Sequence, residues 1–194
     1  MAKLPLVALI SGRGSNLKAI IDAADPLIEI RAVISNRPQA PGLLYAQQAG
    51  IATQIIDHKT FKSRIEFDTA LQTAIDHYQP KLVILAGFMR ILSPDFIKHY
   101  RGRLLNIHPS LLPAFKGLHT HQRVLQSNME EHGTSVHFVT EELDSGPVII
   151  QARVPVLPDD DEDSLAARVL QEEHRIYPQA IHWFAQGRVQ LQEK

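Results

Sequence analysis

Apolar runs of strand length alternate with helix-forming segments along the first half of the chain, and this alternation restricts the fold more than any other feature. Residues 6–10 and 82–86 are continuously apolar, as expected of parallel strands buried on both faces. Between them, apolar residues recur at helical spacing in residues 17–24 and 63–78. This order predicts an α/β fold with an open, mostly parallel, doubly wound Rossmann-like sheet and right-handed crossovers.

The pattern changes in the last third of the chain, where two strands follow one another without a helix. Residues 134–139 and 148–156 are strand-like, and only the turn at residues 140–147 separates them. This hairpin spacing predicts antiparallel strands at one edge of the sheet. The other expected elements are strands at residues 30–34, at 53–56 and up to Ile107, and helices at residues 42–48, from Pro94, near 121–126 and at 164–185.

Composition excludes several classes of function. The chain has 194 residues, with 20 basic and 21 acidic side chains and no cysteine. The resulting net charge of -1 gives no general attraction for nucleic acid or an anionic membrane. The lack of cysteine excludes disulfides, thiolate metal ligands and thiol nucleophiles. We expect one cytoplasmic domain, residues 1–194, without a signal peptide or membrane span, acting on small molecules as a monomer or homodimer.

A glycine-containing turn, residues 11–16, joins the first strand to the first helix. Such a turn directs free backbone N–H groups and the positive end of the helix dipole at an anion. It is not a dinucleotide fingerprint, because Leu17 occupies the third glycine position and no ribose-binding acid follows the second strand. A single phosphate is the better interpretation, and a turn without a ligand is the alternative.

Asn106 and His108 are the leading catalytic candidates. They lie two residues apart on a strand, so their side chains leave the same face near its carboxyl end, where open α/β sheets bind ligands. Asp144, in the turn at 140–147, can reach back over the end of the sheet. The alternatives are that Asn106 caps a turn, that His108 is a half-buried histidine with satisfied nitrogens, and that Asp144 is solvated or caps its turn.

Other positions also have side chains that a ligand could use. Arg64 lies near the start of a helix, where the dipole disfavours a cation, although an exposed arginine is the commoner explanation. Residues 87–92 are unusually apolar for a loop and would suit a flat heterocycle or simply the core. Glu173 falls on the apolar stripe of the last helix, which requires a ligand group or a neighbouring arginine, Arg168 or Arg175, as partner.

Several motifs together resemble the phosphoribosylglycinamide formyltransferase family. They are residues 85–92, 105–113, 117–121, 132–138 and 143–147, and the likeness extends from Ser11 to about Trp183. This family transfers a formyl group from 10-formyltetrahydrofolate to the amine of glycinamide ribonucleotide, a step of purine synthesis and of one-carbon metabolism. The resemblance therefore implies the formyltransferase fold, with 10-formyltetrahydrofolate as co-substrate and no metal.

The resemblance also implies roles for individual residues. Asn106, His108 and Asp144 match the catalytic trio of the family. The N-terminal half is expected to bind the ribonucleotide, and the C-terminal half to bind folate and hold the catalytic residues. Arg13 matches no fixed position, so its role stays open. The implied ribonucleotide-binding residues are Gly14, Ser15, Asn16 and Glu173, and the implied folate-binding residues are Arg64, Met89, Arg90, Ile91, Leu92 and Asn106.

The chemistry of formyl transfer suits the trio. Attack of an amine on an N-formyl carbon gives a tetrahedral oxyanion, which pre-aimed hydrogen-bond donors stabilise. Asn106 and a protonated His108 would donate, while the Asp144 carboxylate would favour the imidazolium and orient its ring. The pair could also move the amine proton to the leaving nitrogen, directly or through water. His119, His121 and His137 are possible metal ligands, but no further ligand lies at the spacing typical of a metal-binding motif.

Rival functions share parts of this site. Methionyl-tRNA formyltransferase would need an RNA-binding domain, for which 194 nearly neutral residues leave no room. Formyltetrahydrofolate deformylase uses a similar trio with water as the acceptor, and the phosphate turn favours the ribonucleotide enzyme over it. A folate- or nucleotide-sensing module without activity is a third alternative, because a fold does not dictate activity.

Overall fold

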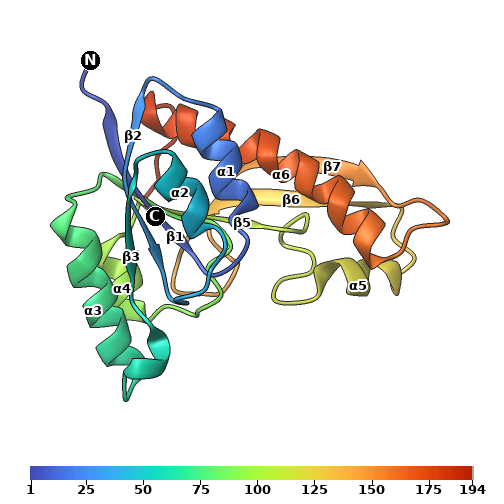
Figure 1. The fold of residues 1–194 in the computed structure, drawn as a ribbon. Coiled ribbons are helices and arrows are strands. Elements are labelled where there is room, and N and C mark those ends of the chain that lie inside the picture. Colours follow the sequence, from blue (N-terminus) through green and yellow to red (C-terminus); the bar gives the residue numbers. More distant parts are fainter. Residues whose placement is uncertain (194) are drawn as a thin grey trace.

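A sheet with strand order β3-β2-β1-β4-β5-β6-β7 organises the chain, as seen in a computed structural model that describes residues 1–193 (Figure 1). The strands are β1 Leu4–Ile10, β2 Ile28–Ser35, β3 Ala52–Ile55, β4 Leu82–Leu85, β5 Leu104–His108, β6 Glu131–Phe138 and β7 Val148–Pro155. The helices are α1 Ser15–Asp22, α2 Leu43–Gln48, α3 Arg64–His77, α4 Pro94–His99, α5 Thr120–Leu125 and α6 Glu162–Ala185, with a short 3-10 helix at His58–Thr60.

Strand directions confirm the predicted fold class. β1 to β5 pair in parallel, whereas β6 pairs antiparallel with both β5 and β7. Parallel neighbours need a crossover helix between them, which explains the alternation in the first part of the sequence. The antiparallel edge corresponds to the expected hairpin. β6 begins earlier than expected, at Glu131, and the 3-10 helix was not predicted.

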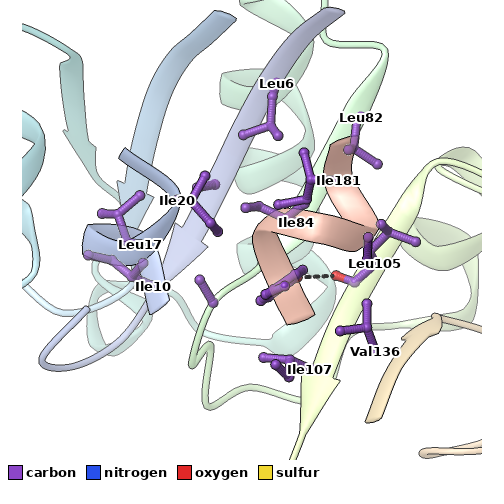
Figure 2. Close-up of a cluster of buried hydrophobic side chains, with 14 of the residues drawn as sticks. Leu6, Ile10, Leu17, Ile20, Leu82, Ile84, Leu105, Ile107, Val136 and Ile181 are labelled. Carbon is purple, nitrogen blue, oxygen red and sulfur yellow. Dashed lines mark hydrogen bonds between the residues drawn. The ribbon is translucent and has the colours of Figure 1, made fainter. Parts of the chain in front are cut away.

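Helices cover both faces of the sheet because the strands are apolar on both sides. Leu6, Ala8 and Ile10 of β1 pack with α1, α2 and α6, whereas Val7 and Leu9 face α3 and α4. Figure 2 shows the first of these layers, in which side chains of α1 and α6 meet those of β1, β4 and β5. The buried hydroxyl of Tyr177 in α6 donates to the carbonyl oxygens of Leu85 and Leu105, at 2.8 and 3.2 Å.

Helix caps fix where the helices begin. Ser63 accepts from the N–H of Glu66 at the start of α3, and Asp161 forms a capping box with Ser164 at the start of α6. The acidic run at residues 159–163 therefore supplies a helix cap, as predicted, because carboxylates complement the dipole at a helix N-terminus. Within residues 1–193, none of the helices has the length and apolar character that crossing a membrane requires.

Candidate active site

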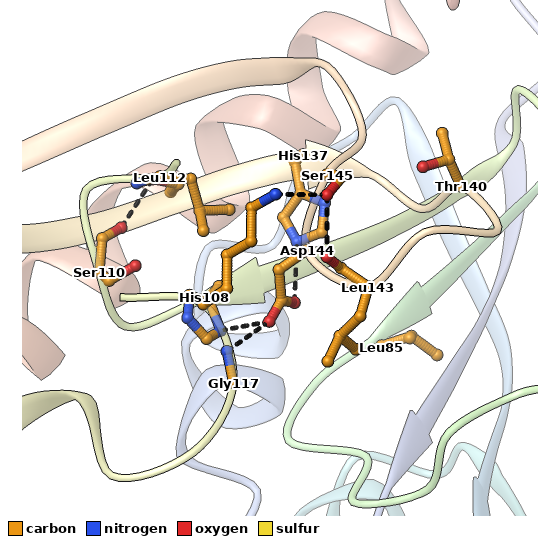
Figure 3. A network of polar contacts seen from close by, with 12 residues as sticks. Leu85, His108, Ser110, Leu112, Gly117, His137, Thr140, Leu143, Asp144 and Ser145 are labelled. Atoms are coloured by element: carbon orange, nitrogen blue, oxygen red, sulfur yellow. Dashed lines mark hydrogen bonds and ion pairs between the residues drawn. The ribbon is translucent and has the colours of Figure 1, made fainter. Parts of the chain in front are cut away.

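β5 and the β6–β7 turn bring the three catalytic candidates to one end of the sheet. Asn106 is half-buried and His108 is buried, both at the carboxyl end of β5. Asp144 lies in the turn with a backbone φ of 50°. The His108 Nδ1 and Asp144 Oδ2 atoms are 3.6 Å apart, and both side chains are less than a tenth exposed (Figure 3). The predicted pairing of His108 with Asp144 is thus present in the fold.

Both ring nitrogens of His108 face oxygen atoms. Nε2 lies 2.8 Å from the carbonyl oxygen of Phe115, which can only accept, so Nε2 carries a proton. Nδ1 faces the Asp144 carboxylate. The site therefore places Nδ1 beside a carboxylate, where either group can exchange a proton with a bound ligand.

The turn that contains Asp144 is held in place by close backbone contacts. Asp144 Oδ2 accepts a hydrogen bond from the N–H of Gly117 at 2.9 Å. A Cβ atom at Gly146 would lie 1.7 Å from the carbonyl oxygen of Phe138, so only glycine fits there. Gly146, in the motif at residues 143–147, therefore has a structural role, which is to let the turn fold back over β6.

His137 is a further candidate site residue that the sequence analysis considered only as a metal ligand. Its side chain is 2% exposed, and Nδ1 lies 2.9 Å from the carbonyl oxygen of Phe138. Nε2 lies 4.0 Å from Asp144 Oδ1 and has no hydrogen-bond partner among residues 1–193. Burial lowers the pKa of His137, so the ring is neutral and Nε2 is an acceptor. His137 comes close to the trio because it pairs with Asn106 across β5 and β6, and the local sequence has no signal for this register.

Asn16 and Glu173 meet although they belong to different ends of the chain. Asn16 Nδ2 in α1 donates to Glu173 Oε1 in α6 at 3.1 Å, and Asn16 Oδ1 has no partner within residues 1–193. Burial raises the pKa of Glu173 to about 7, and the hydrogen bond from Asn16 partly offsets this. The arginines considered as alternatives pair elsewhere, Arg168 with Asp160 and Arg175 with Glu172.

The glycine turn before α1 packs closely against Gly42 at the start of α2. Gly14 has a φ of 72°, and a Cβ atom there would lie 2.6 Å from the Cα atom of Gly42. A Cβ atom at Gly12, in contrast, would meet nothing within 4 Å. Ser15 is the first residue of α1, where helix N–H groups lack intrahelical partners. The turn thus leads directly into helix N–H groups that have no intrahelical partners.

The expected folate-binding residues are only partly gathered in one cavity. A cavity of about 510 Å³ is lined by Arg64, Ile91 and Leu92, and by Glu141 from the turn that contains Asp144. Met89 does not line it, and the guanidinium of Arg90 lies 5.1 Å from the ring centroid of Phe67. That cavity also excludes Asn106, His108 and Asp144.

The histidines outside the trio do not form a metal site in the part of the chain described. No three His, Cys, Asp or Glu side chains among residues 1–193 are grouped so that they could hold a metal ion. His121 instead lies next to His132, with Nδ1 and Nε2 3.0 Å apart. Burial lowers the pKa of His132 to about 4, so this pair is neutral.

The chain is similar to known proteins along nearly its whole length. A family model described as formyl transferase matches residues 4–181. Phosphoribosylglycinamide formyltransferase of Escherichia coli is 58% identical over 191 residues, which cover 97% of this chain and 90% of that protein. The human trifunctional purine biosynthetic protein adenosine-3 is 45% identical over 98% of this chain and 19% of its own length. A phosphoribosylglycinamide formyltransferase structure from Coxiella burnetii superposes with a TM-score of 0.95 at 55% identity, covering 99% of this chain and 92% of that one.

Proposed function

The chain belongs to the formyl transferase family, and on that premise we propose that it transfers the formyl group of 10-formyltetrahydrofolate to the amine of 5-phosphoribosylglycinamide in purine biosynthesis. The observation that carries this proposal is the buried contact between His108 and Asp144 at the end of β5. That contact places an imidazole donor and a carboxylate in the same small volume, as formyl transfer between two nitrogens requires.

The first step is addition of the amine to the formyl carbon. A carbon–nitrogen bond forms, and the carbonyl electron pair moves to oxygen to give a tetrahedral oxyanion. His108 Nδ1 lies 3.6 Å from Asp144 Oδ2, longer than a hydrogen bond, so a proton carried by Nδ1 can be donated to the oxyanion. Asn106, two residues earlier on the same face of β5, donates its amide N–H beside it.

The second step is collapse of the intermediate. The bond between the formyl carbon and the folate nitrogen breaks, and that nitrogen takes up a proton while the amine loses one. Asp144 accepts the amine proton and, directly or through water, returns a proton to the leaving nitrogen. The neutral His137 faces the same carboxylate and can share in holding that water.

The remaining assignments position the two substrates. Gly14, Ser15 and Asn16 hold the phosphate with backbone N–H groups at the start of α1, and Glu173 binds the ribonucleotide beside Asn16. The folate contacts Asn106, and it contacts Arg64, Ile91 and Leu92 in the cavity. Met89 and Arg90, which lie outside that cavity in the segment after β4, are assigned to folate as well.

The same proposal includes the organisation of the chain. A single domain, residues 1–194, would use its N-terminal half for the ribonucleotide and its C-terminal half for folate and catalysis. A cytoplasmic location and action as a monomer or homodimer, without nucleic-acid or membrane partners, belong to it as well. The net charge of -1 supports the expectation that nucleic acids and membranes are not partners.

One incubation separates this function from its rivals. The protein is mixed with 10-formyltetrahydrofolate, with and without phosphoribosylglycinamide, and the release of tetrahydrofolate is followed. Turnover that requires the ribonucleotide supports formyl transfer. Release of formate without the ribonucleotide would indicate a deformylase, and binding without turnover would indicate a sensing module.

A further inference from the structure

Ser11 connects the chain segments that follow three neighbouring strands. Its side chain is buried at the end of β1, which lies between β2 and β4 in the sheet. The Ser11 hydroxyl donates to Oδ1 of Asn36, directly after β2, and accepts from the N–H of Met89, after β4, at 2.8 Å. The Ser11 N–H also donates to the carbonyl oxygen of Gly87 at 3.2 Å. No catalytic or binding role assigned so far uses this residue.

The segment after β4 depends on Ser11 for its position. Among residues 1–193, the Met89 N–H is the only backbone donor from Gly87 to Leu92 with a hydrogen-bond acceptor in the protein. Phe88 and Leu92 are buried in the core and anchor the segment on either side, whereas Met89 and Ile91 are each 58% exposed. The stretch between the two anchors has few hydrogen bonds and exposed side chains, so it rearranges more easily than the anchors. The Ser11 hydroxyl therefore fixes the backbone of this proposed folate-binding segment at Met89.

Ser11 is also the first residue of the proposed phosphate-binding turn, residues 11–16. Gly12, the next residue, accepts a hydrogen bond from the N–H of Gly42 at 3.0 Å, and Gly14 packs closely against Gly42. Asn36, the acceptor of the Ser11 hydroxyl, is 1% exposed, and its backbone oxygen lies 3.0 Å from Nδ1 of His58. A ligand that restrains the turn therefore restrains Ser11, which has little freedom to move separately.

We propose that Ser11 is a positioning residue that couples the two substrate sites, so that a ribonucleotide on the glycine turn orders the segment at Met89 for folate. This inference rests on the proposed function, because it needs both ligands to bind where assigned. Coupling of this kind is reciprocal, so bound folate strengthens ribonucleotide binding by the same factor. Part of this coupling is entropic. The first ligand to bind restricts the motion of the two segments, so the second ligand does not have to restrict it again.

The test measures tetrahydrofolate binding by calorimetry with and without saturating phosphoribosylglycinamide. Tetrahydrofolate has no formyl group, so no reaction occurs. For the wild type we expect the ribonucleotide to lower the dissociation constant of tetrahydrofolate about fivefold or more. We call the dissociation constant without ribonucleotide divided by that with ribonucleotide the coupling ratio. For Ser11→Ala we expect this ratio to fall to about one, and tetrahydrofolate alone to bind about tenfold more weakly.

Ser35→Ala is the matched control. Ser35 is also a buried serine at a strand end, but its hydroxyl bonds to the backbone of Arg37, at 2.8 and 3.0 Å, and reaches neither ligand segment. We expect this variant to keep the wild-type ratio. Asn36→Ala removes the acceptor of the Ser11 hydroxyl, so it should lower the ratio too. Adding it to Ser11→Ala should lower the ratio no further.

The experiment distinguishes failure of this inference from failure of the proposed function. A wild-type ratio of one, or a Ser11→Ala ratio equal to that of the wild type, overturns the inference while leaving the proposed function intact. A wild type that binds neither ligand is instead the failure of the proposed function, and takes the inference with it. Thermal melting shows whether Ser11→Ala is folded. If it is not, an unchanged ratio in folded Asn36→Ala overturns the inference.

Discussion

The imidazole of His108 lies 3.6 Å from the carboxylate of Asp144, although one residue ends a central strand and the other lies in a turn at the edge of the sheet. The contact is buried, and it is held from both sides by the carbonyl of Phe115 and the N–H of Gly117. Screening by water and salt is weak at such a position. An imidazole next to a carboxylate, both shielded from solvent, is therefore a structural feature of this end of the sheet.

Replacing the donor tests one half of this pair. We predict that His108→Ala lowers kcat about a hundredfold or more, because the oxyanion loses a charged hydrogen-bond donor. Steady-state kinetics with both substrates checks this. His99→Ala is a suitable control, since His99 pairs with Asp76 on the surface between α3 and α4. Near-normal activity of His108→Ala would remove His108 from the reaction.

Glu173 should make the stability of the protein depend on pH. Its pKa is raised by burial from 4.5 to about 7, so the folded state holds a proton that the unfolded chain has already lost in this range. Stability from this group is therefore complete below about pH 4.5 and is lost as the pH rises through about 7. The loss is of the order of 3 kcal/mol.

Urea unfolding at pH 5 and pH 8 measures this effect. We predict that the wild type loses more stability between these values than Glu173→Gln, which cannot ionise. The difference between the two proteins isolates Glu173 from other titrating groups. Equal losses in both proteins would show that Glu173 titrates as an ordinary carboxyl.

Arg64 should act on folate binding alone. We predict that Arg64→Ala raises the KM for 10-formyltetrahydrofolate severalfold with little change in kcat, because Arg64 lines the cavity beside Ile91 and no member of the trio lines that cavity. Lys62→Ala is the control, since Lys62 is an exposed cation nearby that does not line that cavity. An unchanged KM for folate would make Arg64 a surface cation without a ligand.

Inorganic phosphate should compete with the ribonucleotide for the glycine turn. We predict that phosphate or sulfate raises the apparent KM for phosphoribosylglycinamide without lowering kcat, as a competitive inhibitor does. Gly14→Ala should weaken this competition, because its Cβ atom would displace Gly42. Gly50→Ala carries a similar backbone strain, at a φ of 71°, without such a contact, and should not weaken it. Absence of competition in the wild type would make the turn purely structural.

The fold was predictable because each strand pairing leaves a mark on the local sequence. Parallel strands need helical crossovers and antiparallel strands need only a turn, so the alternation before Ile107 and the hairpin at 134–156 determine the strand directions. Asn106 and His108 were also found from local pattern, since they lie on one face of a single strand.

Contacts between distant elements were not predictable in the same way. The hydrogen bond between Asn16 and Glu173 depends on how α1 and α6 pack together, and the role of Ser11 depends on the order of three strands. His137 faces Asp144 only because the β5–β6 register places it opposite Asn106. Local periodicity contains no information on register, which side-chain packing and turn geometry set.

Asp144→Asn gives the most direct test of the central claim, because it removes the carboxylate charge while keeping the shape of the side chain. The quantities to measure are kcat and the KM values for both substrates, with Asp163→Asn at the first turn of α6 as the control. We predict that kcat falls about a hundredfold or more with little change in either KM. A kcat for Asp144→Asn within a few-fold of the wild type would contradict the assignment of the buried pair as the source of the proton transfer.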